Sequence, residues 1–199
     1  MKVVAFNGSP RPDGNTAAII KLVFGELEKS GIQTELVQVG GTSVRGCTSC
    51  YFCHNNKSQF CAVKSDPLNE WIEKIMEADG IILGSPVYFN GITPEMKALM
   101  DRTGFVARAN GRMFKQKIGA AVVVLRRNGA VSALDSMMHY LLSMQMFLVG
   151  GSNNVIANKI GDVDKDAEGV QNMRTLGENM SVLLNMKKAY ESKLPPFLV

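Results

Sequence analysis

The chain has 199 residues, of which 46% are hydrophobic and 20% charged, and its formal net charge is +4. This composition fits one globular domain with a full core, so we expect residues 1–199 to form a single domain. The modest charge and the scattered basic side chains argue against a nucleic-acid partner. The chain has neither an apolar stretch of about 18 residues nor a signal sequence, so we expect no membrane span and a cytoplasmic location.

The first predicted unit is a buried strand that leads through a polar loop into a helix. An apolar run over residues 3–6 is typical of a strand buried on both faces, and apolar residues recur at helical spacing between 19 and 27. Residues 8–16 between them are rich in small, hydroxyl and amide side chains. A helix N-terminus offers unpartnered N–H groups and the positive end of the helix dipole, which together bind phosphate. We therefore predict a phosphate cradle with contacts from Ser9, Arg11, Asn15 and Thr16.

The same loop has two other interpretations. A P-loop needs four residues between its glycines and a lysine before the hydroxyl residue. Here five residues separate Gly8 from Gly14, and Asn15 stands where the lysine would be. Triphosphate chemistry is therefore poorly supported. The second interpretation is an ordinary turn in which Asn15 caps the helix.

Strands and helices alternate along the rest of the chain. The further elements that the pattern predicts are an edge strand at 33–39, a helix from 67, a strand at 81–84, a helix from 94, a central strand at 117–125, a helix at 130–143, a strand at 146–149 and a helix containing 170–184. Five β-α units predict an α/β fold with a doubly wound, five-stranded parallel sheet and helices on both faces. In the flavodoxin-like strand order 2-1-3-4-5, the loops after the first, third and fourth strands meet and bind FMN.

The loops after the third and fourth strands suit a flavin ring. A flavin needs an apolar wall and amide or backbone groups at its pyrimidine edge. The first loop supplies these types of group as Pro86, Val87, Tyr88, Phe89, Asn90 and Gly91. In the turn at 126–129, we predict ring contacts from the backbone of Asn128 and Gly129, whereas its two arginines are equally well explained as solvated. An alternative role for Tyr88 and Phe89 is to cover the helix that lies below them. No GxGxxG motif occurs, so a nicotinamide cofactor is expected only as a transient visitor.

All four cysteines lie in an irregular insertion at 45–65, with the spacing C-x2-C-x2-C-x7-C. Three thiolates at two-residue intervals can wrap one [4Fe–4S] cluster, as in the bacterial ferredoxin run. The predicted ligands are Cys47, Cys50, Cys53 and, as a local fourth, Cys61. Zinc is the main alternative, although all-cysteine zinc sites usually use two well-separated pairs. A labile disulfide and free thiols are further alternatives.

These motifs together resemble the NADPH-dependent FMN reductase family and, within it, the iron-sulfur flavoproteins of anaerobes. Residues 8–16 look like the family's FMN phosphate loop, residues 85–91 like its flavin-ring loop, and the cysteines like its compact cluster motif. The resemblance covers nearly the whole chain. One departure is the segment 126–130, which lacks the double glycine common after the fourth strand in FMN reductases.

The resemblance implies one FMN per subunit, ferredoxin-like electron donors, and a homodimer or homotetramer in which a neighbour helps to close the flavin site. It also implies conversion between two-electron and one-electron transfer. Because the loop after the second strand leaves the sheet at the FMN edge, we expect the cluster on the flavin side, in this subunit or across an interface.

The predicted function is an FMN-dependent oxidoreductase without an obligatory acid-base side chain. It relays electrons between a [4Fe–4S] cluster or NAD(P)H and FMN, because the chemistry belongs to the cofactors. The alternatives are an NAD(P)H:FMN or quinone reductase without a cluster, and a non-catalytic flavin-binding or zinc-stabilised interaction protein.

Overall fold

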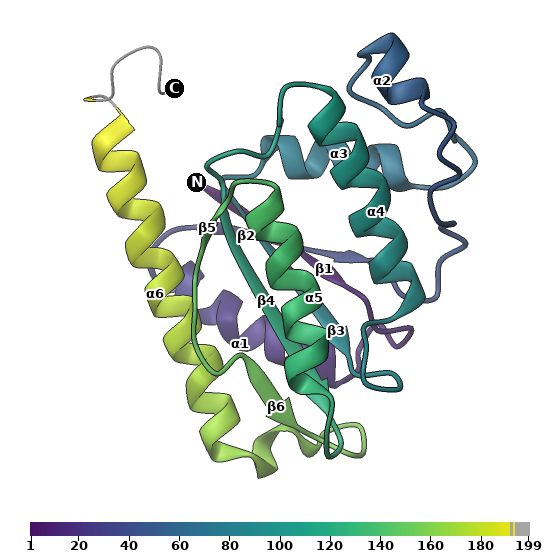
Figure 1. Cartoon of the computed structure of the whole chain (residues 1–199). Helices are drawn as coiled ribbons and strands as arrows, with labels where there is room; N and C mark the ends of the chain where they lie inside the picture. The colour runs from purple at the N-terminus through teal and green to yellow at the C-terminus, as the bar shows by residue number, and fades with distance from the viewer. Residues whose placement is uncertain (192, 194–199) are drawn as a thin grey trace.

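A parallel β-sheet forms the centre of the protein (Figure 1), whose computed structural model describes residues 1–191 and 193. Its strand order is β2-β1-β3-β4-β5, with β6 also paired to β4. The strands are β1 (Lys2–Asn7), β2 (Gln33–Gln38), β3 (Gly80–Pro86), β4 (Ile118–Leu125), β5 (Phe147–Leu148) and β6 (Asn154–Ile156). The flavodoxin-like strand order expected from the sequence is confirmed, and the sheet has one strand more than expected.

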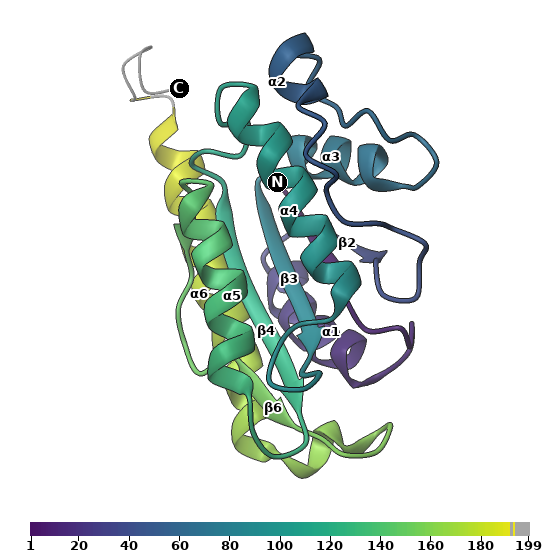
Figure 2. The same ribbon diagram turned by 45° about the vertical axis from the view of Figure 1, so that its right-hand side comes forward.

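Helices cover both faces of the sheet. They are α1 (Asn15–Lys29), α2 (Phe52–Asn56), α3 (Leu68–Glu77), α4 (Pro94–Ala109), α5 (Ala130–Ser143), the short 3-10 helix η1 (Asp162–Lys165) and α6 (Ala167–Glu191). α1 and α6 pack on one face, whereas α3, α4 and α5 pack on the other (Figures 1 and 2). None of the helices in the described part of the chain has the length and apolar character needed to cross a membrane.

The central strands supply a hydrophobic core to each face. In β1, Val3 and Ala5 pack against α1 and α6, whereas Val4 and Phe6 pack against the helices of the opposite face. All four side chains are fully buried. Successive residues of a strand point to opposite faces, so a strand covered on both sides must be apolar throughout. This explains the unbroken apolar runs in β1 and β4.

The edge strand beyond β4 is divided into two pieces. β5 pairs with the start of β4, where Phe147 lies opposite Ile118, and β6 pairs with its end, where Asn154 lies opposite Val123. Between them the chain leaves the sheet at residues 150–152, since the Val149 N–H and the Asn153 carbonyl still form hydrogen bonds with β4. The sequence predicts β5 and treats the following residues as a loop, so β6 was missed. A strand of three residues carries too little alternation to be recognised by its pattern.

The cysteine insertion between β2 and α3 runs back along α4. Figures 1 and 2 show α2 at the C-terminal end of α4, far from the carboxyl ends of β3 and β4. Of the two positions expected for the cluster, the one on the flavin side of the same subunit is therefore wrong, and the one across an interface stays a prediction. The insertion leaves the sheet at its carboxyl edge, as expected, but the cysteines lie farther along the outer helix.

Candidate functional site

A cleft opens at the carboxyl edge of the sheet, where β1, β3, β4 and β6 end. It encloses about 670 Å³ of empty space, counted out to its open mouth. The lining comes from the loop after β1, the first turn of α1, the start of the loop after β3, the end of β4 and the segment after β6, and consists of Ser9, Arg11, Gly14, Asn15, Thr16, Pro86, Val87, Tyr88, Val124, Leu125, Arg126, Ala157, Asn158 and Ile160. All four predicted phosphate contacts thus meet three of the predicted ring contacts in one place.

The phosphate side of the cleft is the N-terminus of α1. This helix begins directly after Gly14, and no side chain in the described part of the chain caps it. The Thr16 residue is 2% exposed, and its hydroxyl makes no hydrogen bond to any residue that the structure describes. Ser9 is also buried, and its hydroxyl accepts a hydrogen bond from the Arg11 backbone N–H at 3.2 Å. Free backbone donors beside hydroxyl groups form a ready anion-binding site.

Buried polar side chains hold the phosphate loop in place. The Asn7 side chain accepts a hydrogen bond from the Ser9 N–H at 3.0 Å and donates one to Gln38 at 2.8 Å. Gln38 in turn donates to the Ser9 carbonyl at 2.6 Å. From the other side, the Thr93 hydroxyl donates to the Gly8 carbonyl at 2.8 Å. The loop is therefore positioned by β2 and by the start of α4, which are contacts that the sequence alone does not reveal.

The Asn15 side chain connects the cradle to the opposite wall. Its amide nitrogen donates to the Lys159 carbonyl at 2.8 Å, and its oxygen accepts from the Gly161 N–H at 3.0 Å. These two bonds fasten the segment after β6 against the start of α1. Asn15 lines the cleft, and we expect it to support ligand binding by holding the segment after β6 in place as one wall of the cleft.

The ring loop after β3 ends in a tight turn. Tyr88 and Gly91 exchange two backbone hydrogen bonds of 2.9 and 3.0 Å. Phe89 and Asn90 between them have positive φ angles of 46° and 67°, and the Phe89 side chain is fully exposed. Pro86, Val87 and Tyr88 line the cleft, whereas Phe89, Asn90 and Gly91 lie outside its lining.

The turn after β4 packs against the ring loop. A Cβ atom on Gly129 would lie 2.8 Å from the Asn90 Cα, so only glycine fits this contact. Asn128 and Gly129, which we predict as ring contacts, lie outside the lining, and Arg126 lies in it.

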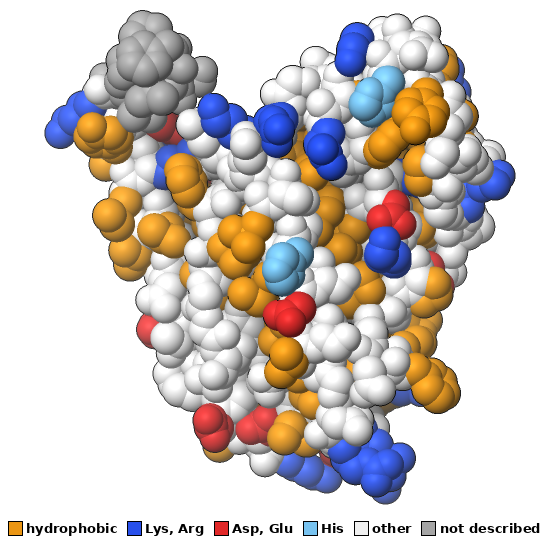
Figure 3. Space-filling view, viewed as in Figure 1, with side chains coloured by type: hydrophobic (Ala, Val, Ile, Leu, Met, Phe, Trp, Pro, Cys, Tyr) orange, Lys and Arg blue, Asp and Glu red, His pale blue; other side chains and the backbone are white. Residues whose placement is uncertain are grey.

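Several lining residues were not predicted because they follow the unrecognised strand β6. They are Ala157, Asn158 and Ile160, and the end of β4 adds Val124, Leu125 and Arg126. The apolar run at 155–157 is the sequence signal from which β6 could have been predicted. Among the described residues, the lining contains the cations Arg11 and Arg126 and no Asp or Glu. A lining with positive and without negative side chains favours an anionic ligand. In Figure 3, basic side chains lie at the lower right of the molecule and acidic ones at its lower left.

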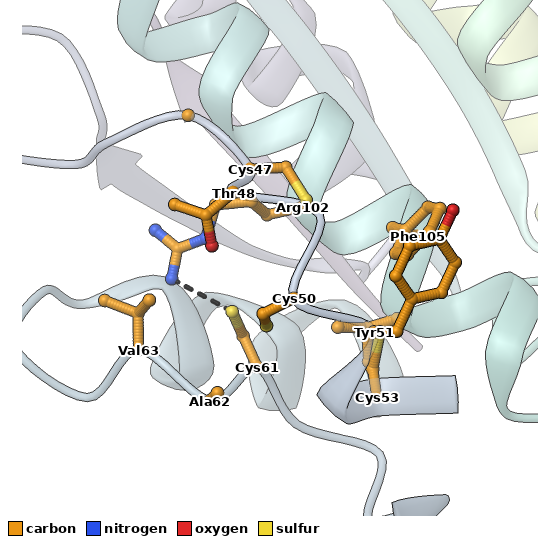
Figure 4. A pocket seen from close by; sticks show the side chains of 12 residues that line it. Cys47, Thr48, Cys50, Tyr51, Cys53, Cys61, Ala62, Val63, Arg102 and Phe105 are labelled. Carbon is orange, nitrogen blue, oxygen red and sulfur yellow. Dashed lines mark hydrogen bonds between the residues drawn. The ribbon is translucent and has the colours of Figure 1, made fainter. Parts of the chain in front are cut away.

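The four cysteines line a second, smaller pocket (Figure 4). Cys47 and Cys50 are exposed, Cys53 is buried in α2, and Cys61 is half-buried. The far wall comes from Arg102, Phe105 and Val106 of α4. In the described part of the chain, no three side chains of His, Cys, Asp or Glu are close enough to hold a metal ion in the arrangement seen. The insertion therefore brings the predicted ligands to one pocket without closing them into a metal site.

The backbone of the insertion adopts an unusual conformation around this pocket. Four residues other than glycine have positive φ angles there, namely Ser49 (52°), Tyr51 (57°), Lys57 (51°) and Gln59 (66°). Each such residue costs about 1–2 kcal/mol, and such costs concentrate at functional sites. The bend at Ser49 lets its N–H donate to the Cys47 sulfur at 3.4 Å. Burial raises the pKa of the Cys53 thiol, and a backbone hydrogen bond of His54 offsets part of the rise.

Arg102 is a buried cation in the cysteine pocket. Its side chain is 1% exposed and forms an ion pair of 2.5 Å with Asp66, whose side chain is 3% exposed. It also donates to the Arg45 carbonyl at 3.1 Å and to the Cys61 sulfur at 3.2 Å. Burial lowers the pKa of Arg102, but its hydrogen bonds and charge interactions with Asp66 and Cys61 together raise the pKa by more, so the guanidinium stays charged. The sequence signal for this buried cation is its position, because Arg102 comes three residues after Leu99 and so lies on the apolar face of the predicted helix.

The sheet order and the anion-binding cleft at its carboxyl edge define the flavodoxin-like class of FMN-binding proteins. Solved structures share this fold. RosB, solved with 8-demethyl-8-formylriboflavin-5'-phosphate, matches with a TM-score of 0.72 and 17% identity over 95% of this chain and 81% of its own. A flavodoxin from the domain Archaea matches with a TM-score of 0.61 and 17% identity over 93% of this chain and 99% of its own.

Sequence relatives define the family more closely. The chain belongs to the NADPH-dependent FMN reductase family, whose model matches residues 1–160. An iron-sulfur flavoprotein of Methanocaldococcus jannaschii is 32% identical over 197 residues, which is 94% of this chain and 100% of the relative. An iron-sulfur flavoprotein of Methanosarcina thermophila is 28% identical over 188 residues, covering 94% of this chain and 96% of the relative. The chain is therefore a flavin-dependent oxidoreductase, as predicted.

Proposed function

We propose that this protein is an iron-sulfur flavoprotein that relays electrons between a [4Fe–4S] cluster or NAD(P)H and FMN. The observation that carries the proposal is the gathering of all four cysteines at one pocket in a chain whose fold provides an FMN cleft. When bound, FMN exchanges electron pairs with a nicotinamide and single electrons with a cluster. The protein's own residues hold the cofactors, exclude water and set their electrostatic surroundings.

The described residues fit FMN in the cleft. The uncapped start of α1 and the Thr16 hydroxyl would hold the phosphate, with Arg11 nearby as a counter-charge. Val87 and Tyr88 offer an apolar wall for the ring. These two walls favour a ligand that has an anionic end and a flat apolar end, and a flavin mononucleotide has both.

We expect Thr16→Ala to weaken FMN binding by about tenfold or more, because a hydrogen bond to a charged phosphate contributes about 1.5–3 kcal/mol. Fluorescence titration of the apoprotein measures the affinity, and Thr16→Ser, which keeps the hydroxyl, is the control. Asn15→Ala should weaken binding as well, by releasing the wall at Lys159 and Gly161. Unchanged affinity in both alanine variants would contradict the assigned phosphate position.

The cysteine pocket fits a cluster by its chemistry. Four thiols are the ligands that a [4Fe–4S] cluster takes. Two of the sulfurs already accept hydrogen bonds, Cys47 from the Ser49 N–H and Cys61 from Arg102. Hydrogen bonds to the ligand sulfurs are a recurrent feature of such sites and tune them. Cys47 and Cys50 lie on an exposed loop without regular structure, so they can draw together around a metal.

The two sites lie apart along α4, which bears on how electrons pass between them. The helix starts beside Thr93, which contacts the phosphate loop, and reaches the cysteine pocket at Arg102 and Phe105. These residues are eight to eleven positions further along the helix from Pro94, which is roughly 12–16 Å at 1.5 Å per residue. We infer that the relay runs between subunits, with the cysteine pocket of one copy facing the cleft of another.

A homodimer or homotetramer is part of this proposal. The outer surfaces of α5 and α6 carry exposed hydrophobic side chains (Figure 3), which include Val131, Leu142, Val182, Met186 and Tyr190. The two helices lie on opposite faces of the sheet, so each offers its own apolar surface, and exposed apolar patches are typical of subunit interfaces. Tyr51 and Phe52 are also exposed beside the cysteine pocket and would suit the docking of a ferredoxin-like donor or a second copy.

Anaerobic purification with assays of FMN, iron, acid-labile sulfide and zinc tests the proposal. We expect about one FMN, four iron and four sulfide per chain, with overlapping flavin and cluster absorption. Cys50→Ser should lose iron and sulfide and keep FMN, because the cysteines do not line the FMN cleft. Protein that never binds FMN would contradict the whole proposal.

The second candidate is an NAD(P)H:FMN or quinone reductase without a cluster. It is favoured by the finding that, among the described residues, the thiols do not converge to metal-binding distance. Flavin without iron or sulfide, both before and after anaerobic reconstitution, would establish this candidate. Stoichiometric zinc that resists replacement by iron would assign the cysteines a structural role.

A further inference from the structure

The guanidinium of Arg102 donates hydrogen bonds to three partners in the cysteine pocket, two through Nη1 and one through Nη2. Its Nη1 is held by the Asp66 carboxylate at 2.5 Å and the Arg45 carbonyl at 3.1 Å. Its Nη2 is aimed at the Cys61 sulfur, 3.2 Å away (Figure 4). The Asp66 carboxylate therefore fixes the orientation of the guanidinium. Its other nitrogen, Nη2, donates to the sulfur of one predicted cluster ligand, Cys61.

Packing alone does not explain this arrangement. A buried ion pair contributes little net stability compared with apolar side chains of similar volume. Arginine also differs from lysine because its planar fork can engage two partners at fixed angles. Here those partners are a carboxylate and a sulfur, so the side chain is suited to hold a positive charge at the sulfur.

We propose that Arg102 is a positioning residue that raises the reduction potential of a cluster bound by the four cysteines, and that Asp66 holds it in place. This inference rests on the proposed function. One-electron reduction adds negative charge to the cluster and its thiolates. A cationic donor on the Cys61 sulfur stabilises the reduced form more than the oxidised form, and hydrogen bonds and net charge at the sulfurs set the potential. The carboxylate lies on the other arm of the guanidinium, so it weakens this effect without cancelling it.

Anaerobic potentiometric titration, followed by electron paramagnetic resonance of the reduced cluster, tests the proposal. In Arg102→Gln, the ratio of reduced to oxidised cluster at a fixed potential should fall about tenfold, which is 59 mV for a one-electron couple. In Asp66→Asn, the uncompensated guanidinium should move the ratio the other way. Shifts of opposite sign within one ion pair would not arise if the pair served only to support the fold.

Two further variants make the test decisive. Arg108→Gln removes an exposed arginine from the same helix and should leave the potential unchanged. Arg102→Lys keeps the charge and loses the fork, so its potential should lie between those of the wild type and Arg102→Gln. If Arg102→Gln does not assemble a cluster, Arg102→Lys and Asp66→Asn carry the test, and unmoved potentials in both overturn the inference. Wild-type protein without iron would instead contradict the proposed function itself.

Discussion

Replacing Gly40 with alanine is expected to deform the phosphate loop and to abolish tight FMN binding. Gly40 follows β2 and lies directly beneath the loop, where a Cβ atom would come within 2.3 Å of both the Gly8 carbonyl oxygen and the Ser9 carbonyl carbon. These are backbone atoms, so no side-chain rotation can relieve the clash. The loop must move, and the hydrogen bond from Gln38 to the Ser9 carbonyl that holds the loop would be lost.

We expect a loss of about 3 kcal/mol in the free energy of unfolding, at the upper end of the cost of overpacking, and FMN affinity lowered by more than tenfold. Denaturant unfolding and fluorescence titration measure the two effects. Gly25→Ala is the matched control, since Gly25 lies in α1 and, apart from its chain neighbours and the backbone of its own helix, no atom of the described residues lies within 4 Å of the added methyl group. That variant should bind FMN normally and be slightly more stable, because alanine favours helix. Normal FMN binding by Gly40→Ala would show that the loop adapts.

Replacing Arg102 with leucine is expected to be the most destabilising single change in the cysteine pocket. It leaves the Asp66 carboxylate buried without its cation, and breaking a buried pair in this way costs about 3–5 kcal/mol. Denaturant unfolding of the metal-free protein measures this cost apart from any cluster. The same measurement should give nearly normal unfolding for Arg108→Leu, which changes an exposed position of α4.

The double variant Arg102→Leu, Asp66→Leu separates the two causes of this loss of stability, the unpaired charge and the altered packing. With both charges removed, no uncompensated ion remains, so the double variant should be more stable than Arg102→Leu alone. A double variant no more stable than the single one would show that the cost arises from packing around Arg102 and not from the unpaired carboxylate.

The central strands were predictable because their signal is local. A strand with helices on both faces must be apolar at every position, and the runs in β1 and β4 meet that condition over consecutive residues. The edge strand was harder. β6 has three residues and owes its conformation to pairing with Val123 and its neighbours in β4, which no local pattern encodes. The helix α2 is likewise short and depends on α4 for its packing.

The phosphate loop was also a local prediction, since loop and helix start are contiguous. The residues that position it lie far along the chain: Gln38 and Thr93 meet the loop only in the folded protein. The same reason explains why Arg102 was missed, because its partner Cys61 comes from the insertion and its partner Asp66 from the segment that follows the insertion. Sequence spacing placed the cysteines together, but the side of the sheet they occupy depends on how the insertion packs on α4.

The divided strand β5–β6 also affects how copies of this protein can meet. An uninterrupted edge strand offers a row of free N–H and C=O groups to which a second chain can add, and this leads to aggregation. Here that edge consists of strands of two and three residues, and between them the chain leaves the sheet at residues 150–152. At the opposite edge, β2 carries Glu35 in ion pairs with Lys2 and Lys74. Both margins thus discourage strand addition, so we expect any assembly to join through helices and to leave the sheets of its subunits separate.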